Sequence, residues 1–185
     1  MPLIRTELED IFWRVTIKLL GMDPDSEDQA VQQRVRYQYP DGDMGNSDWK
    51  RNEDVIFLSI SPTDEDYTLL REASFEEDST GNLKEVVRYH KCHSLQWICY
   101  GPHCDEDADR IRIGILREPV RAYLRKNNLA VLSEIPQPIR ISELDEAGQT
   151  WERTDLTARC YELAERSYPA AAIELPPEFH INATN

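Results

Sequence analysis

The sequence is short of positive charge and has no long apolar run, and both shortages exclude functions. Its 185 residues include 21 Lys and Arg against 35 Asp and Glu, which gives a formal net charge of −14. Domains that bind nucleic acids or anionic membrane surfaces need basic patches, so we expect neither kind of partner. No apolar stretch approaches the roughly 18 residues that cross a bilayer. The hydrophobic fraction of 40% is still enough for the core of one domain.

Several functional motifs are also missing. The sequence has neither a GxxxxGK nor a GxGxxG segment, and its acidic clusters lack the spacing of a calcium loop. Residues 1–7 have no basic start and no apolar run, so we expect no signal peptide. Four cysteines without a secretion signal then predict free thiols and assembly in the cytoplasm. We find no positive reason to expect catalytic residues, a metal or a cofactor.

Metal ligation is the strongest alternative to that expectation. Histidines and cysteines crowd into one short stretch that contains His90, Cys92, His93, Cys99, His103 and Cys104. Zinc requires four such ligands in a tetrahedral arrangement. On a strand, however, side chains alternate in direction, so His90 and Cys92 point away from His93 and Cys99. We therefore favour ordinary strand residues with small buried thiols, and the same alternation disfavours Cys92 and His93 as a nucleophilic pair.

Apolar spacing predicts two helices. The first spans residues 3–20, and the second spans residues 105–127. Asp105 or Asp107 is the expected cap of the second helix. Pro119 lies inside its pattern and should kink or split it.

The rest of the chain predicts a mainly antiparallel or mixed sheet, with both helices packed on one face, and therefore an α+β fold. Strands are expected at residues 31–39, 55–60, 84–100, 129–132, 139–144 and 151–165. Residues 63–82 are acidic without a clear period and are expected to form an exposed connection. The two longest strands exceed the usual length, which predicts long hairpin projections. We divide the chain into one domain at 1–167 and an extended, Pro-containing arm at 168–185.

Three short segments together resemble the neck or tail terminator proteins of tailed bacteriophages. They are residues 53–58 (EDVIFL, with Pro62 and Tyr67 downstream), 97–102 (WICYGP) and 151–156 (WERTDL). The likeness extends from about residue 12 to residue 165.

The resemblance implies a structural protein of the virion, without catalytic residues, that is assembled in the host cytoplasm. Such proteins form a ring, usually a hexamer, that ends tail-tube polymerisation and offers a docking surface to the head. The implied partners are further copies of the chain, the tail tube protein, a head-side connector or adaptor and possibly the tail sheath. Two other readings stay open: a different neck ring, such as a connector or adaptor, and an acidic DNA mimic that inhibits a host protein.

Strong acidity suits a conduit, because carboxylates repel the phosphates of passing DNA and prevent specific binding. The candidate acids of the channel or its loops are Asp64, Glu65, Asp66, Glu76 and Glu77. Trp49 and Tyr67 lie in predicted loops, where an aromatic residue either anchors a protein contact or folds back over a sheet edge.

Arginines are the other candidate contacts between subunits or with partners. Arg117, Arg121 and Arg125 recur at four-residue spacing and form one basic stripe on an acidic protein. The alternative for this stripe is a solvated helix face with local ion pairs. The last long strand offers further candidates at Arg153, Arg159 and Arg166.

Overall fold

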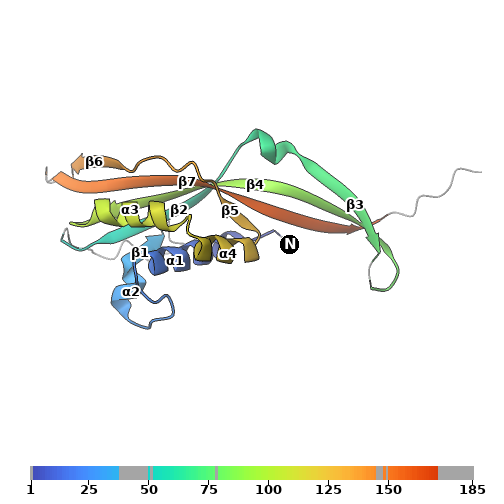
Figure 1. Ribbon diagram of the computed structural model, residues 1–185, viewed down its shortest axis with the longest axis horizontal. Helices are drawn as coiled ribbons and strands as arrows, with labels where there is room; N and C mark the ends of the chain where they lie inside the picture. The colour runs from blue at the N-terminus through green and yellow to red at the C-terminus, as the bar shows by residue number, and fades with distance from the viewer. Residues whose placement is uncertain are drawn as a thin grey trace, which may run out of the picture.

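Two long antiparallel strands organise the molecule. In the computed structural model, which describes residues 2–37, 50, 52–77, 79–144, 148 and 150–170, β4 (Leu83–Tyr100) pairs with β7 (Thr150–Pro169). The pairing is continuous from Lys84 opposite Pro169 to Tyr100 opposite Arg153. Both strands are much longer than an average strand, and they run nearly the full length of the molecule (Figure 1).

The remaining strands border this central pair. The order across the sheet is β1-β2-β4-β7-β5, while β3 also pairs with β4 and β6 also pairs with β7. The pairing of β1 with β2 is parallel and all other pairings are antiparallel. The bordering strands are β1 (Val35–Tyr37), β2 (Val55–Thr63), β3 (Arg71–Glu77), β5 (Leu129–Val131) and β6 (Ile139–Leu144).

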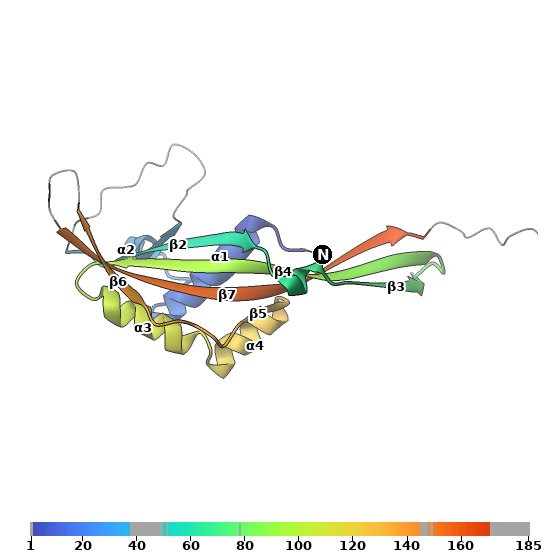
Figure 2. The same ribbon diagram turned by 90° about the horizontal axis from the view of Figure 1, so that it is seen from above.

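Helices cover one face of the half of the sheet that contains β1 and β2 (Figures 1 and 2). They are α1 (Arg5–Leu19), α2 (Gln29–Arg34), α3 (Cys104–Gly114) and α4 (Glu118–Lys126), and a 3-10 turn, η1 (Asp66–Leu69), follows β2. Trp97 of β4 is fully buried beneath α1, and its indole Nε1–H donates a 2.9 Å hydrogen bond to the Thr16 hydroxyl. The alternation of β4 therefore sends one set of side chains into the helix-covered core.

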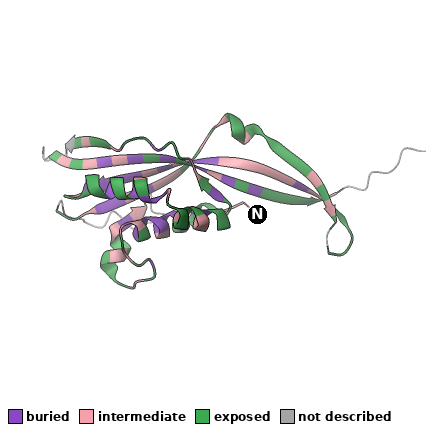
Figure 3. Ribbon diagram, viewed as in Figure 1, coloured by how far each residue is buried: buried purple, intermediate pink, exposed green. Residues whose placement is uncertain are grey.

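The other half of the sheet projects from the helices as an arm. We define the arm as β3, residues 83–91 of β4 and residues 162–169 of β7. Figure 3 shows mostly exposed and half-buried residues there, whereas buried residues concentrate in the helix-covered body. Within the arm, Val86 and Ala164 are fully buried. The predicted α+β fold and its long hairpin projection are therefore confirmed.

One predicted strand was wrong over its first four residues and right over its next three. Residues 31–34 of the predicted strand 31–39 belong to α2 (Gln29–Arg34), and the strand begins only at Val35. The carboxylate of Asp28 caps α2 by accepting a 2.9 Å hydrogen bond from the Ala30 N–H. Val31 and Val35 are four residues apart, a spacing that fits a helix as well as a strand. The last two residues of the prediction lie outside the described part of the chain.

Residues 63–82 are exposed or half-buried wherever the structure describes them, as predicted, but they are not a simple connection, because they contain η1 and all of β3. Exposed and half-buried residues alternate along β3 without a buried one. Backbone pairing with β4, rather than an apolar pattern, holds this strand in the sheet. A strand that borders an uncovered arm need not show the period on which strand prediction depends.

The second predicted helix is split, as Pro119 suggested. Pro119 lies in the first turn of α4, where its missing N–H requires no partner. The expected cap was wrong, since α3 begins at Cys104 and its cap is His103. Asp105 and Asp107 lie within the first turn of the helix, and Asp107 is buried in an ion pair with Arg34. The split and α2 together explain why the described residues contain four α-helices rather than two.

The predicted boundary between the domain and its terminal arm falls inside β7, which continues to Pro169. Residues 171–185 of that predicted arm lie outside the described part of the chain.

Candidate assembly surfaces

The three segments that carry the family resemblance are neighbouring strands. Residues 53–58 lead into β2, residues 97–102 end β4, and residues 151–156 begin β7. In the register of the sheet, Leu58 lies opposite Trp97, and Trp97 lies opposite Leu156. Segments far apart in the sequence thus build one side-by-side unit at the end of the molecule away from the arm.

The tight turn that leads from β4 to α3 packs closely against the segment that leads into β2. Gly101 has a φ of +104°, and a Cβ placed there would lie 2.5 Å from Asp54 Oδ1 and 2.7 Å from the Glu53 carbonyl oxygen. The Asp54 carboxylate accepts hydrogen bonds from the His103 backbone N–H at 2.9 Å and from His103 Nδ1 at 2.8 Å. The hydrogen bond and the negative charge of Asp54 raise the pKa of His103. Only glycine fits this turn without a shift of the neighbouring chain.

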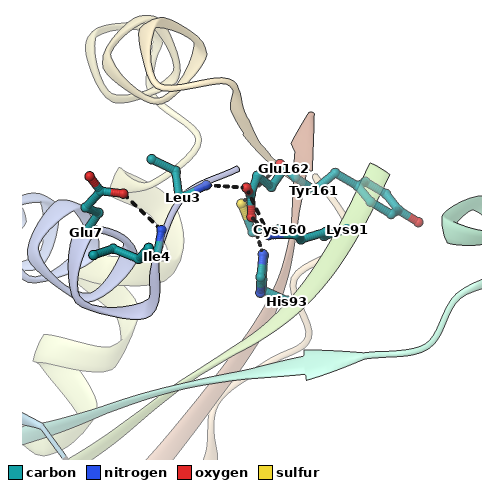
Figure 4. Close-up of polar contacts among 8 residues, drawn as sticks. All are labelled: Leu3, Ile4, Glu7, Lys91, His93, Cys160, Tyr161 and Glu162. Carbon is teal, nitrogen blue, oxygen red and sulfur yellow. Dashed lines mark hydrogen bonds and ion pairs between the residues drawn. The ribbon is translucent and has the colours of Figure 1, made fainter. Parts of the chain in front are cut away.

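A buried carboxylate lies where the arm leaves the body. Glu162 of β7 is 1% exposed and accepts hydrogen bonds from the Leu3 N–H at 2.7 Å and from His93 Nε2 at 2.8 Å (Figure 4). The Lys91 ammonium lies 3.3 Å from the same carboxylate. Burial alone would raise the pKa of Glu162, but the hydrogen bonds from His93 and Leu3 and the charge of Lys91 outweigh it and leave the pKa lowered.

The Glu162 cluster fastens the N-terminal segment to the root of the arm. Figure 4 shows Leu3 and Ile4 leading from this carboxylate into α1, where the Ile4 N–H donates to Glu7 at 2.9 Å. A pocket of about 500 Å³ adjoins the cluster and is lined by Leu3, Lys91, His93 and the last part of β2. Glu162 is not predicted from the sequence, because only the register of β4 against β7 places it opposite Lys91.

The histidines and cysteines of residues 90–104 do not converge. His93 points to Glu162, whereas His103 points to Asp54 at the far end of the body. Within the described ranges, no group of three His, Cys, Asp or Glu side chains is arranged to hold a metal ion. Cys99 and Cys104 lie in the hydrophobic core, as does Cys160.

Burial makes the thiols poor nucleophiles. It raises the pKa of Cys160 to about 12 and that of Cys99 further still, and it also raises the pKa of Cys92. All four cysteines are free and buried. Because the thiolate is the reactive form, a raised pKa lowers the reactivity of Cys92, Cys99 and Cys160 at neutral pH.

Tyr67 folds back over the sheet, on the face away from the helices. Its ring lies 5.0 Å from His90 and 5.9 Å from Tyr161, measured between ring centroids. Beside it, Glu65 forms an ion pair with Arg159 of β7. The ring of Tyr67 is still 52% exposed, so part of it remains available for a partner. Trp49, the other aromatic candidate, lies outside the described residues.

The predicted basic stripe lies along α4 and the turn before it. Arg117 is the residue that precedes α4, and all three arginines of the stripe are exposed. Arg125 forms an ion pair with Glu118. Arg117 and Arg121 form no ion pair with any residue that the structure describes. Of the candidates on β7, Arg153 is half-buried and binds Asp155 at 2.9 Å, and Arg159 forms an ion pair with Glu65.

The candidate acids lie between the end of β2 and the tip of the arm. Glu65 and Glu76 are engaged within the molecule, since Glu76 accepts a 2.9 Å hydrogen bond from Arg88. Asp64, Asp66 and Glu77 are exposed and form no ion pair within the described ranges. Two of the five candidate acids are therefore bound to arginines of the same chain, and the other three are exposed without an ion pair in the described ranges.

Comparisons with known proteins show which family this chain resembles. None of the helices in the described residues is both long and apolar enough to cross a membrane. A search of curated proteins found no significant similarity to this chain. A protein-family model described as "Phage neck terminator protein" matches residues 6–182, which is nearly the whole chain. The chain therefore belongs to the phage neck terminator family and is a structural protein of the bacteriophage neck.

Proposed function

We propose that this protein forms a hexameric ring at the end of the tail tube. There it stops tube polymerisation and joins the tail to the head-side connector. The observation that carries the proposal, beyond family membership, is the projecting arm. A single small domain has no need of a three-stranded sheet extending beyond its helices. Such an extension suits contact with a neighbouring subunit, because exposed strands and sheet faces are common recognition surfaces.

The charge of the protein supports a passage for DNA. Six copies would together carry a large negative charge, and carboxylates along a lumen would repel the phosphates of the genome. Asp64, Asp66 and Glu77 are the strongest candidates for this lining, because they are exposed and unpaired in the described ranges. Repulsion between exposed charges is screened beyond about 8 Å at physiological salt, so ring closure must rest on local contacts.

The proposed partners lie on the two faces of the ring. The tail tube protein would meet one face and a head-side connector or adaptor the other, with the tail sheath as a further neighbour in contractile tails. Arg117 and Arg121 on the exposed side of α4 are candidates for one of these contacts, because arginine is well suited to bind carboxylates of a partner.

Disruption of the gene tests the proposal. We expect the mutant to make tubes longer than those of the wild type, without attached heads, and expression of the protein in trans should restore tail length. Electron microscopy of mutant lysates measures both outcomes. Tails of normal length in the mutant would contradict a terminating role. Density for this protein away from the last tail-tube ring would instead assign it to another ring of the neck.

A further inference from the structure

One face of the arm combines apolar side chains with two arginines that lack an acidic partner. The register places Arg71 opposite Tyr89, and Val87 opposite Arg166, so these side chains share the face that continues the helix-covered side of the sheet. We call this the arm face; it contains Arg71, Phe75, Val87, Tyr89, Arg166 and Tyr168. Phe75 is 61% exposed and Tyr168 46% exposed. Between the two arginines lies a hollow of about 300 Å³.

The opposite face of the arm satisfies its own charges. There, Arg88 donates to Glu76 at 2.9 Å and to Glu165 at 2.8 Å. On the arm face, Arg166 instead interacts with Tyr168 and Tyr89. Neither Arg71 nor Arg166 forms an ion pair with any residue in the described ranges. In a chain with a net charge of −14, two neighbouring arginines that form no ion pair in the described ranges indicate that an acidic partner comes from outside the chain.

A surface of the complementary kind lies at the other end of the molecule. The outer side of α3 exposes Ile113, which is 58% exposed, and two acids at Glu106 and Asp109. Asp109 follows Glu106 by three positions and Ile113 follows Asp109 by four, so the three residues share one side of the helix. Arg110 lies beside them, and the register places Glu77 and Glu85 on the same side of the arm as Arg71, so each surface also carries charge of the other sign. Figure 1 shows α3 in the part of the body remote from the arm tip.

We propose that the arm face of one copy binds the outer side of α3 of the next copy. Ile113 would enter the hollow between Val87 and Tyr89, and Glu106 and Asp109 would bind Arg71 and Arg166. Because the two surfaces differ, the contact is head-to-tail and generates a ring when its rotation closes. At about 3.3 Å per residue, the arm reaches roughly 25 Å beyond the body, which is enough to overlap a neighbour. The inference rests on the proposed ring and names the surfaces that close it.

Charge reversal in virions tests this contact. In a phage whose own gene is disrupted, we would supply either the double variant Arg71→Glu/Arg166→Glu or the double variant Glu106→Arg/Asp109→Arg. Each alone should reduce the yield of particles with terminated, head-bearing tails at least tenfold, whereas the two pairs combined in one chain should restore it. The matched control Lys18→Glu/Lys126→Glu reverses two exposed charges outside the proposed contact and outside the candidate contacts with the tube and connector, and it should leave the yield unchanged.

Cross-linking gives a second readout that does not depend on charge reversal. In virions that carry both Arg166→Cys and Asp109→Cys in each chain, oxidation should join neighbouring copies into a ladder up to the full ring, whereas each single variant should give no ladder. The proposed contact between the arm face and α3 would be overturned if the folded charge variants left assembly unchanged. It would also be overturned if the double cysteine chain formed no ladder. In both cases the ring proposal would still stand. Normal tails without any copy of the protein would overturn the ring proposal itself.

Discussion

The backbone N–H of Leu3 donates a 2.7 Å hydrogen bond to the carboxylate of Glu162, 159 positions later in the chain. This bond joins the segment before α1 to the strand that continues into the arm. His93 and Lys91 of β4 complete the cluster from the neighbouring strand. The first residues of the chain thus help to set where the helix-covered body ends and the arm begins (Figure 4).

Replacement of Glu162 should destabilise the protein and change its response to acid. Because the pKa of Glu162 is lowered in the folded state, its stabilising effect is present above the unfolded value near 4.3 and disappears as the pH falls through the folded value. Glu162→Gln should lower the free energy of unfolding at pH 7 by about 1–3 kcal/mol. It should also flatten the acid dependence between about pH 5 and pH 3. Urea denaturation over that range measures both effects.

Glu165→Gln is the control for that experiment, because Glu165 lies on the same strand but forms an exposed ion pair with Arg88. It should change stability by less than about 1 kcal/mol. Equal effects of the two substitutions would contradict the structural importance of the Glu162 cluster.

Substitution of Gly101 by alanine should loosen the turn between β4 and α3. The new Cβ would meet the backbone of Asp54 and Glu53 at 2.7 Å, in a left-handed conformation that alanine disfavours. We expect a loss of about 2–4 kcal/mol in the free energy of unfolding, measured by urea denaturation with tryptophan fluorescence.

Gly21→Ala isolates the effect of the close approach at Gly101. Gly21 also has a positive φ, of +84°, but nothing lies within 4 Å of a Cβ built there. Its substitution should therefore cost only the conformational part, about 1 kcal/mol. Similar losses at the two glycines would mean that the contact with Asp54 is unimportant.

His103 should titrate at a higher pH than a free histidine. The hydrogen bond to Asp54 and the charge of that carboxylate raise the pKa of His103, so the interaction stabilises the fold below about pH 6.5 and is lost as the pH rises through the folded value. NMR titration of the imidazole measures the midpoint. In Asp54→Asn the midpoint should return toward 6.5, whereas an unchanged midpoint would assign the raised pKa to another group.

The thiols should be almost inert in the native protein. Burial encloses all four cysteines and raises the pKa of three of them, so a thiol reagent at pH 7 should react slowly with the folded chain. The four thiols should all react rapidly once the chain is unfolded in urea. One thiol that reacts in the native protein as fast as free cysteine would instead revive the thiol-enzyme hypothesis.

Much of the fold could be predicted from apolar periodicity. Leu8, Ile11, Phe12 and Val15 of α1 lie on the buried side of a single helix, and their spacing alone predicts it. Most of β4 and β7 could be predicted in the same way, because their extended pattern covers more positions than an average strand. Prediction failed for β3 and α2, since neither contains a buried residue. Local patterns reveal an element only where one of its faces enters the core.

The sequence by itself determined the class of the protein: an acidic α+β chain with unusually long strands and three segments typical of phage neck terminators. Only the tertiary structure decided which side chains act together. The register of β4 against β7 buries Glu162 beside His93, and the register of the arm places Arg71 and Arg166 on one face. A shift of β7 by one residue would turn Glu162 away from His93 and Arg166 away from the face that carries Arg71, because side chains alternate between the faces of a sheet. That register depends on contacts between distant segments, which no local pattern of residues records.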